Sequence, residues 1–519
     1  MPVYFIGYST DCAVSCCDIL CYKMNNHTDI GSTLYQKFTQ WDWWGGRNHR
    51  IFTVIVFIIL ASLDNSARAV APPLYAIMAH DLGVSEWALG IATGLNILVV
   101  AITSVLWGYW GDRSSRKKLL LYGTIIWSIA MYLTGVAQTY TQYLIWQLIT
   151  AIGIGCIASV GFSVVTDLIP PGRRGLFMSF WGLSQANGGG LGALAGSLLG
   201  ASNWRLPFIV IATAGVAFAI LYIFTYEPRR GQSEPELAKI FAKGQRYGRR
   251  IRKSDLKKIL RIRSNIWVLL QGLAATVAFG SLVWMPRLYI GKLQALGYDL
   301  QTATIAGNIL ALTLQGGLYV AIIGGIWGDW WQRRNLAGRA WLCTIGTLGS
   351  IPFLLLLFFL PLPEFVLPTN ATKAELVWAT ILGIFTHRWV FLSWVVALLG
   401  FGLLSLDVPN RSALLSDLNQ PEHRGTVAGM NTLLAGAGLA VGNGLTGLAQ
   451  TYLLTNFAAP TNYAIGLAVF QLFFIPAGLF YARMIKTTPG DIARARRTLA
   501  RRAEQTVTER ITDEYIAVK

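Results

Sequence analysis

Residues 108–118 read Gly-Tyr-Trp-Gly-Asp-Arg-Ser-Ser-Arg-Lys-Lys, and residues 325–334 repeat the pattern as Gly-Ile-Trp-Gly-Asp-Trp-Trp-Gln-Arg-Arg. Each copy follows a long apolar run. Two further pairs of segments recur in the same order along the chain: 166–175 with 416–425, and 72–75 with 286–289. The sequence therefore predicts two related halves in tandem.

The composition is that of a membrane protein. Of the 519 residues, 54% are hydrophobic and only 13% are charged, and the mean hydropathy is +0.48. Soluble domains carry about 25% charged residues. Unbroken apolar runs such as 51–63, 91–106 and 389–406 indicate membrane-spanning helices. We expect an all-α polytopic membrane protein. A duplicated protein of this kind favours a transporter, because alternating access needs two bundles that move against each other.

The apolar runs predict twelve spans, six in each half. In the first half they cover about 51–78, 86–110, 118–137, 141–167, 175–200 and 205–226. In the second half they cover about 264–290, 302–327, 338–360, 388–417, 425–452 and 462–484. The predicted organisation is an N-terminal segment (1–50), a six-helix bundle (51–226), a basic linker (227–263), a second six-helix bundle (264–484) and a basic tail (485–519).

Lysine and arginine gather in alternate loops, which explains the net charge of +18 without nucleic acid as a partner. The positive-inside rule places these loops in the cytoplasm, and an even number of spans places both termini there too. We expect an integral protein of the plasma (inner) membrane. The apolar residues of the linker (Leu237, Ile240 and Phe241) predict a helix on the inner membrane surface. The tail after Pro489 is either a second helix on the inner membrane surface or a charged helix that water solvates.

Neither a metal nor a cofactor is expected. Four cysteines (Cys12, Cys16, Cys17 and Cys21) precede the first span, but no histidine cluster accompanies them. A phosphate-binding loop of the Gly-x-x-x-x-Gly-Lys type is also missing, which argues against direct use of ATP. The five histidines are scattered, so the sequence does not favour an enzyme.

Two pairs of opposite charges lie inside predicted spans. Asp64 and Arg68 are four residues apart on span 1, and Asp407 and Arg411 repeat this spacing on span 10. A charge at the centre of a span costs about 2.5–3.5 kcal/mol on insertion scales, so we expect all four to face a wet cavity. Either each aspartate neutralises its own arginine, or the pairs bind substrate charge or carry a proton. Arg287 on span 7 is either a rim or gate residue or snorkels to the surface.

The repeated segment resembles the loop 2–3 signature of the major facilitator superfamily, through Gly108, Asp112, Arg113 and Arg116 and, in the second copy, Gly325, Asp329 and Arg333. The likeness covers residues 51–484 and implies a fold of two pseudo-symmetric six-helix bundles, with spans 1, 4, 7 and 10 around the cavity. A weaker likeness, through Asp64, 167–175 and 227–231, points to the spinster-like branch, whose members move lysophospholipids and sphingoid lipids. The chain departs from these patterns at Asn65, Ser115 and Trp330, and at Gln147, where facilitators often have arginine.

The resemblance also implies a cytoplasmic gate. Asp112 would face the start of span 11 near Gly425, and Asp329 would face the start of span 5 near Gly175, where a helix N-terminus attracts a carboxylate. The expected gate consists of Gly108, Asp112, Arg113, Arg116, Asp167, Arg174, Asp329, Arg333, Asp417 and Arg424. The residues expected at the substrate or coupling site are Asp64, Arg68, Asp407, Arg411, Arg287 and Gln147.

The function predicted from the sequence is secondary active transport by alternating access. The substrate would be an amphipathic small organic molecule or a lysolipid, with protons as the candidate coupling ion and a monomer in the bilayer as the expected state. The alternatives are an exporter of hydrophobic drugs or organic anions, and a membrane sensor without transport activity. The glycines at 188, 192 and 196 fit helix packing and an exporter-like motif about equally well.

Overall fold

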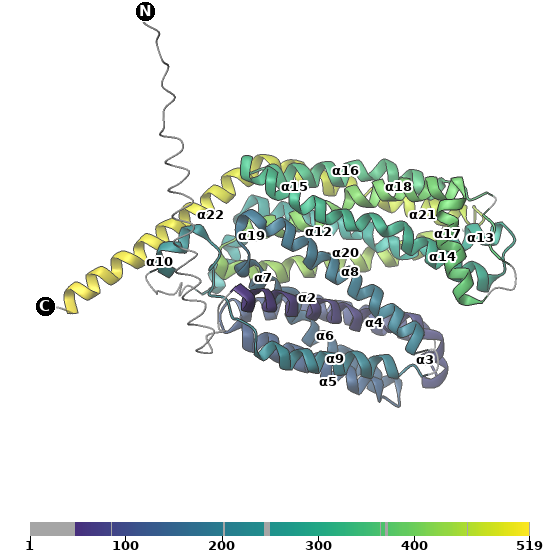
Figure 1. Ribbon diagram of the computed structural model, residues 1–519, viewed down its shortest axis with the longest axis horizontal. Coiled ribbons are helices and arrows are strands. Elements are labelled where there is room, and N and C mark those ends of the chain that lie inside the picture. The colour runs from purple at the N-terminus through teal and green to yellow at the C-terminus, as the bar shows by residue number, and fades with distance from the viewer. Residues whose placement is uncertain are drawn as a thin grey trace, which may run out of the picture.

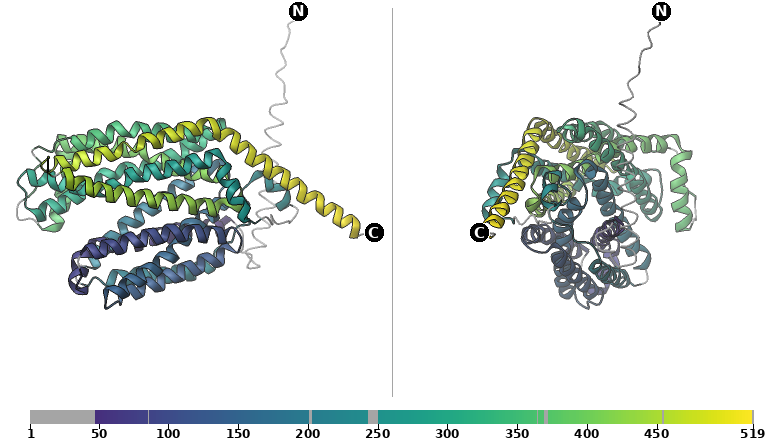
Figure 2. Two further views of the ribbon diagram at one scale, coloured as in Figure 1. Left: turned by 180° about the vertical axis from the view of Figure 1, so that it is seen from behind. Right: turned by 60° about the vertical axis from the view of Figure 1, so that its left-hand side comes forward.

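A computed structural model describes residues 47–517 apart from 85, 201–202, 243–249, 364, 369–371 and 454. The described chain is built of helices that form two bundles lying side by side (Figure 1). The purple-to-teal bundle is the first half of the sequence, and the green-to-yellow bundle is the second half. Figure 2 shows the same division from two further directions. The four N-terminal cysteines lie outside the described residues.

The first bundle contains six spans in sequence order. They are formed by α2 (Arg47–Ala69) with η1 (Pro72–Leu74) and α3 (Tyr75–Leu82), α4 (Glu86–Gly111), α5 (Arg116–Gly135), α6 (Tyr140–Cys156) with η2 (Ile157–Gly161) and α7 (Phe162–Leu168), η3 (Pro171–Arg173) with α8 (Arg174–Leu199), and α9 (Leu206–Ile223). The linker carries η4 (Pro235–Leu237), α10 (Ala238–Ala242) and α11 (Lys253–Arg261).

The second bundle repeats this order with one extra helix, α17. Its elements are α12 (Arg263–Ser281), η5 (Leu282–Trp284), α13 (Met285–Ala295), α14 (Leu300–Leu314), η6 (Gln315–Val320), α15 (Ala321–Arg334), α16 (Gly338–Phe359), α17 (Lys373–Thr386), α18 (Arg388–Ser405), α19 (Asp407–Leu418), η7 (Pro421–His423), α20 (Arg424–Leu453), α21 (Thr461–Gln471) and α22 (Phe474–Ala517). We call the end of both bundles where residues 227–263 lie the linker end.

Eleven helical stretches among the described residues are long and apolar enough to cross a membrane. The remaining predicted span, α8, is also a long helix, but Ser184, Gln185 and Asn187 interrupt its apolar sequence. Lipid-facing stripes are visible in the exposure pattern: Leu98, Ile102 and Leu106 follow one face of α4 and are each about half exposed. The all-α membrane fold expected from the sequence is confirmed.

Several spans are broken where the sequence predicts continuous helices. Proline at 72–73, 286 and 409 lies at or next to a break, because proline cannot donate the helical hydrogen bond and clashes with the preceding turn. Span 4 is interrupted instead by a single π-type turn at Ile157–Gly161. Such turns are rare and frequently occur at functional sites. In this chain the π turn lines the central cavity described below.

The linker and the tail pack against each other. Leu237 and Ile240 are fully buried and form a small core with Leu499 and Ala503 of α22. The expectation that Leu237 and Ile240 rest on the membrane surface is therefore wrong, because the tail covers them. The tail is the continuation of the last span, and Arg502 at its far side pairs with Glu422 at 2.5 Å.

Candidate functional site

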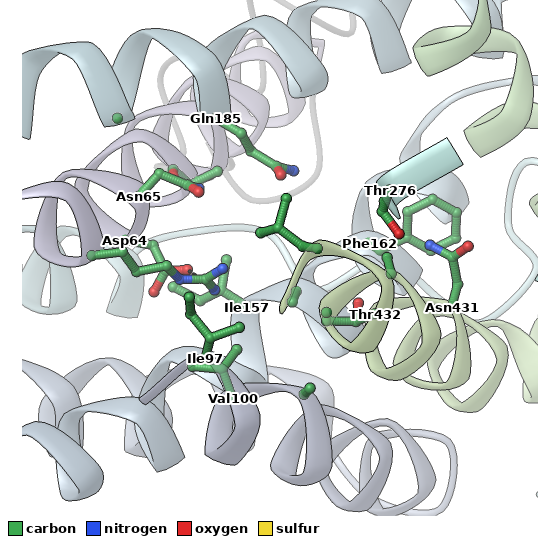
Figure 3. A pocket seen from close by; sticks show the side chains of 18 of the residues that line it. Asp64, Asn65, Ile97, Val100, Ile157, Phe162, Gln185, Thr276, Asn431 and Thr432 are labelled. Atoms are coloured by element: carbon green, nitrogen blue, oxygen red, sulfur yellow. Dashed lines mark hydrogen bonds and ion pairs between the residues drawn. The ribbon is translucent and has the colours of Figure 1, made fainter. Parts of the chain in front are cut away.

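A central cavity of about 560 Å³ lies between the bundles, and both contribute to its walls. Figure 3 shows Asp64, Asn65 and Gln185 on the side of the first bundle, with Thr276, Asn431 and Thr432 on the opposite side. Spans 1, 4 and 10 line it as expected, and span 7 contributes Thr276. The helices α4, α8 and α20 supply most of the remaining wall, which the sequence did not predict.

Asp64 and Arg68 form an ion pair at this cavity. Arg68 Nη2 lies 3.2 Å from Asp64 Oδ2, and both residues line the cavity. The Asp64 side chain is 2% exposed, whereas that of Arg68 is 31% exposed. The second carboxylate oxygen of Asp64 and Nε of Arg68 are buried without a hydrogen-bond partner among the described residues. The pair therefore leaves one acceptor atom and one donor group without partners in the described part of the chain, and these can form hydrogen bonds with a ligand.

The second pair has the same spacing but a different geometry. Arg411 lines the cavity and contacts Asn431 at 3.4 Å, while its Nε lies 3.7 Å from Asp407. Asp407 is not among the lining residues and instead accepts a hydrogen bond from the Tyr481 hydroxyl, inside the second bundle. The expectation that all four charges face the cavity is wrong for Asp407, because α22 supplies a buried phenol as its partner. The cavity wall thus carries one carboxylate and two guanidinium groups.

Two other predicted site residues have contrasting positions. Gln147 lines the cavity, and Asn96 donates both to its side-chain oxygen at 3.2 Å and to its backbone carbonyl at 2.8 Å. Arg287 is exposed on α13 and is not among the lining residues of the cavity. This position agrees with a surface residue and not with a cavity residue. Asn96 is a lining residue that sequence reasoning missed, since a single asparagine in an apolar run carries no spacing signal.

At the linker end each half places an aspartate on the N-terminus of a helix from the other half. Asp112 accepts hydrogen bonds from the Gly425 and Thr426 amides of α20 at 3.1 and 2.7 Å. Asp329 accepts from the Gly175 and Leu176 amides of α8 at 2.8 and 3.0 Å. The first amides of a helix lack intrahelical acceptors and carry partial positive charge, so both contacts are favourable.

Two glycines allow these contacts to form. A Cβ atom on Gly108 would lie 2.3 Å from the Gly425 carbonyl oxygen, and one on Gly325 would lie 2.5 Å from the Gly175 carbonyl oxygen. Both clashes are with backbone, which cannot rotate away. The close approach of helices from opposite bundles at Gly108 and Gly325 therefore requires that neither position carries a side chain.

A symmetric network of buried ion pairs surrounds the two aspartates. Asp167 pairs with Arg116 of its own bundle at 2.5 Å and with Arg424 of the other bundle at 2.8 Å. Asp417 likewise pairs with Arg339 of its own bundle and, at 2.7 Å, with Arg174 of the other bundle. Each half thus contributes one carboxylate that receives an arginine from each side.

Glu234 of the linker joins this network and was missed by sequence reasoning. One of its carboxylate oxygens accepts hydrogen bonds from both Arg174 and Arg424, which occupy matching positions in the two halves. Burial alone would raise the pKa of Glu234, but the two guanidinium groups lower it to about 2. The linker carboxylate is therefore a shared counter-ion of both bundles. Only its position in a charged linker could have suggested it.

Two arginines expected at the gate are not part of the network. Arg113 stacks over the Tyr109 ring and donates to its hydroxyl on an exposed surface. Arg333 is exposed, and among the described ion pairs Asp329 is bound by Arg339 at 2.6 Å instead. Arg339 lies in the first turn of α16 as Arg116 lies in the first turn of α5, so it is the structural counterpart of Arg116. Matching the two copies from Asp329 alone places the counterpart too early, because α15 continues past Asp329 to Arg334, whereas α4 ends before Asp112.

Arg230 of the linker completes the linker end by donating to the backbone carbonyls of Gly111 and Asp112. Burial raises the pKa of Asp112 to about 7, although Arg230 and the hydrogen bonds from Thr426 and Gly425 act to lower it. No group of three or more potential metal ligands occurs among the described residues. The ion pairs and helix-terminus contacts at the linker end can hold the two bundles together, and they can be broken to release them. One of these contacts contains a carboxyl group, that of Asp112, which can take up a proton.

Comparisons with known proteins identify a family. A family model described as Major Facilitator Superfamily matches residues 54–369. The mouse (Mus musculus) sphingosine-1-phosphate transporter SPNS2 is 25% identical over 364 residues, covering 66% of this chain and 61% of that protein. Multidrug resistance protein 3 of Bacillus subtilis is 28% identical over 181 residues, covering 34% of each. The matches span 50% to 64% of the length of the first curated relatives.

Solved structures agree on the fold. A bacterial homolog of the human lysosomal transporter Spinster, in an inward-facing and unoccupied conformation, superposes with a TM-score of 0.55 at 19% identity. The superposition covers 86% of this chain and 99% of that one. At this identity the likeness establishes the architecture and not the substrate.

Proposed function

Since the chain belongs to the major facilitator superfamily of transporters, we propose that it is a secondary active transporter that works by alternating access. In this proposal the linker end faces the cytoplasm, both termini lie on that side, and a monomer operates in the plasma membrane. The basic loops at the linker end support this orientation. The closed linker end and the cavity behind it would correspond to a state that exchanges substrate with the opposite side.

One observation carries the proposal: a polar cavity shared by both bundles lies next to a set of buried ion pairs and helix-terminus contacts that join the bundles at the linker end. Such contacts are two-state elements, because opening replaces each of them with water. The floor of the cavity toward the linker end includes Phe162, Trp181 and Leu415, which would separate substrate from the cytoplasm in this state.

We infer an amphipathic substrate with an anionic or zwitterionic head. The cavity wall carries two arginines against one aspartate, and aliphatic side chains such as Ile97 and Val100 line the same space. A head group would bind near Arg68 and Arg411, while an alkyl chain would pack on the apolar wall. The likeness to a sphingosine-1-phosphate transporter supports a lysolipid or sphingoid lipid. The likeness to a multidrug resistance protein supports the alternative, an exporter of hydrophobic drugs or organic anions.

We propose protons as the coupling ion, with Asp64 as the carrier. A buried carboxylate with one oxygen unpartnered and an arginine one turn away can bind a proton when substrate competes for that arginine. In this scheme the anionic head takes over Arg68, and Asp64 is neutralised by protonation.

The test is flux into proteoliposomes. Purified protein is reconstituted, and uptake of a panel of lysolipids, sphingoid phosphates, hydrophobic cations and organic anions is followed with and without a pH gradient. We expect gradient-dependent uptake of an anionic or zwitterionic amphiphile. Gradient-dependent uptake of cationic drugs instead would select the exporter, and the absence of flux across the panel would favour a membrane sensor.

A further inference from the structure

A second cavity lies in the second bundle at the end opposite the linker. Its volume is about 330 Å³, and it shares no residue with the central cavity. The C-terminal ends of α13 and α16 and the start of α21 form its walls. Apart from Thr461 and one lysine the walls are apolar, with Leu296, Phe358, Pro363 and Ala464 among them.

Lys292 is the one charged group of this cavity. It is 9% exposed, and its Nζ donates to the Leu360 carbonyl at 2.8 Å and lies 5.1 Å from the centre of the Tyr289 ring. Leu360 is the C-cap of α16, so this contact places the ammonium at the negative end of a helix. An ammonium has three N–H groups, and the carbonyl accepts only one of them.

A carboxylate partner for Lys292 does not occur among the described residues, where its Nζ contacts the Leu360 carbonyl. By contrast, the ion pair between Lys258 and Asp255 lies on a surface where water solvates the lysine. A positive charge that is buried in an apolar cavity without a counter-ion is costly, and an anion in the cavity would remove that cost.

The position of the cavity indicates which anion fits. It lies where three spans end, which is the depth of phospholipid head groups. Phe359 and Leu296 line its mouth and are 54% and 41% exposed, so the cavity is continuous with the lipid-facing surface of the bundle. A soluble ion would gain only the contact with the ammonium, whereas an amphiphile would also bury its chain against the apolar walls.

We propose that this cavity is a binding site for one anionic amphiphile of the adjoining leaflet, with a phosphate or carboxylate head on Lys292 Nζ and a single alkyl chain against the walls. The site is separate from the central cavity, and it would bind whether or not the chain transports. Its ligand chemistry overlaps with that of the proposed substrate, so the test must distinguish the two sites.

The experiment measures binding of dodecyl phosphate to the full chain in an uncharged detergent, with the number of bound molecules counted by native mass spectrometry. We expect Lys292→Met to lose one bound molecule or to weaken its binding by at least about tenfold. The matched control is Lys373→Met, an exposed lysine at the same end, which should bind as the parent does. The Arg68→Gln/Arg411→Gln double variant should retain the Lys292-dependent molecule, because it alters only the central cavity.

Further variants and competitors test the proposal even if the Lys292→Met variant does not fold. Leu296→Trp fills the mouth from an exposed position and should also block binding. Competition by inorganic phosphate, equal binding of dodecyltrimethylammonium, or unchanged binding in both Lys292→Met and Leu296→Trp would each overturn the proposal.

Discussion

The linker end and the central cavity differ in how much of the sequence duplication their contacts preserve. At the linker end Asp112 and Asp329 make the same contact with the same kind of helix terminus, and Asp167 and Asp417 each receive two arginines. In the central cavity the matching spacing of Asp64 and Asp407 yields different contacts. The gate retains the symmetry of the repeat, and the cavity has lost it. A symmetric gate fits two alternating states, whereas an asymmetric cavity fits a single substrate orientation.

The largest expected effect comes from breaking the symmetry of the gate at Arg339. Arg339→Gln leaves the carboxylates of Asp329 and Asp417 each without one arginine, and breaking a buried pair costs about 3–5 kcal/mol. Both pairs lie inside the second bundle and persist when the bundles separate, so we expect the folding equilibrium constant to fall by more than about a hundredfold, measured by thermal unfolding. Arg333→Gln is the matched control, and an equal effect there would show that the counterpart of Arg116 is Arg333.

A second variant tests whether the linker is part of the gate. Glu234→Gln removes the charged acceptor shared by Arg174 and Arg424, and hydrogen bonds to charged groups contribute about 1.5–3 kcal/mol. We expect a ten- to hundredfold shift toward the open linker end, measured by spin-label distances between the bundles. Glu236→Gln, two residues away and 3.9 Å from Arg496 in the tail, should leave the distances unchanged.

Because the pKa of Glu234 is lowered to about 2, its contribution is complete above the ordinary glutamate value of 4.5 and is lost only as the pH falls toward 2. The effect of Glu234→Gln should therefore be the same at pH 5.5 and pH 7.5. A Glu234 effect that vanished between these values would contradict the shared ion pair.

The asymmetry of the cavity predicts that substitution of Asp64 mainly lowers flux, whereas substitution of Asp407 mainly lowers stability. Asp64→Asn should lower gradient-driven flux by about tenfold or more with little change in stability, because the residue faces the cavity. Asp407→Asn should retain most of the flux and lower the midpoint of thermal unfolding, since it weakens the buried contact with Tyr481. Equal loss of flux in both variants would indicate that the two aspartates have the same role and would contradict the different roles assigned to Asp64 and Asp407.

The smallest effect concerns acidity at the gate. The pKa of Asp112 is raised by burial from the ordinary 3.8 to about 7, so the closed linker end binds a proton that the open end releases. The closed state is therefore favoured as the pH falls from 7 toward 4, and this advantage is lost as the pH rises through 7. Between pH 7.5 and 6.0 we expect a shift of roughly eightfold, followed by the same distances. Asp112→Asn should remove it.

The fold and the gate could be predicted from the sequence because both depend on repeated features. Long apolar runs indicated the spans, and the resemblance of the repeated segment to the major facilitator signature implied the contacts of Asp112 and Asp329. Asp407 could not be assigned, because its partner Tyr481 lies 74 positions away on another span. Glu234 and Asn96 were missed for a related reason: a single polar residue has no periodicity, and only the packed structure brings it to its partners.

The shared oxygen of Glu234 has a consequence for the transport cycle. Two bundles that separate at the linker end cannot both keep one carboxylate, so it must stay with Arg174 or follow Arg424. The abandoned arginine then faces water and whatever small anions the solution supplies. In the proposed cycle, opening and closing of the linker end would therefore follow different ion pairs, and the anions on that side of the membrane would affect how readily the linker end closes again.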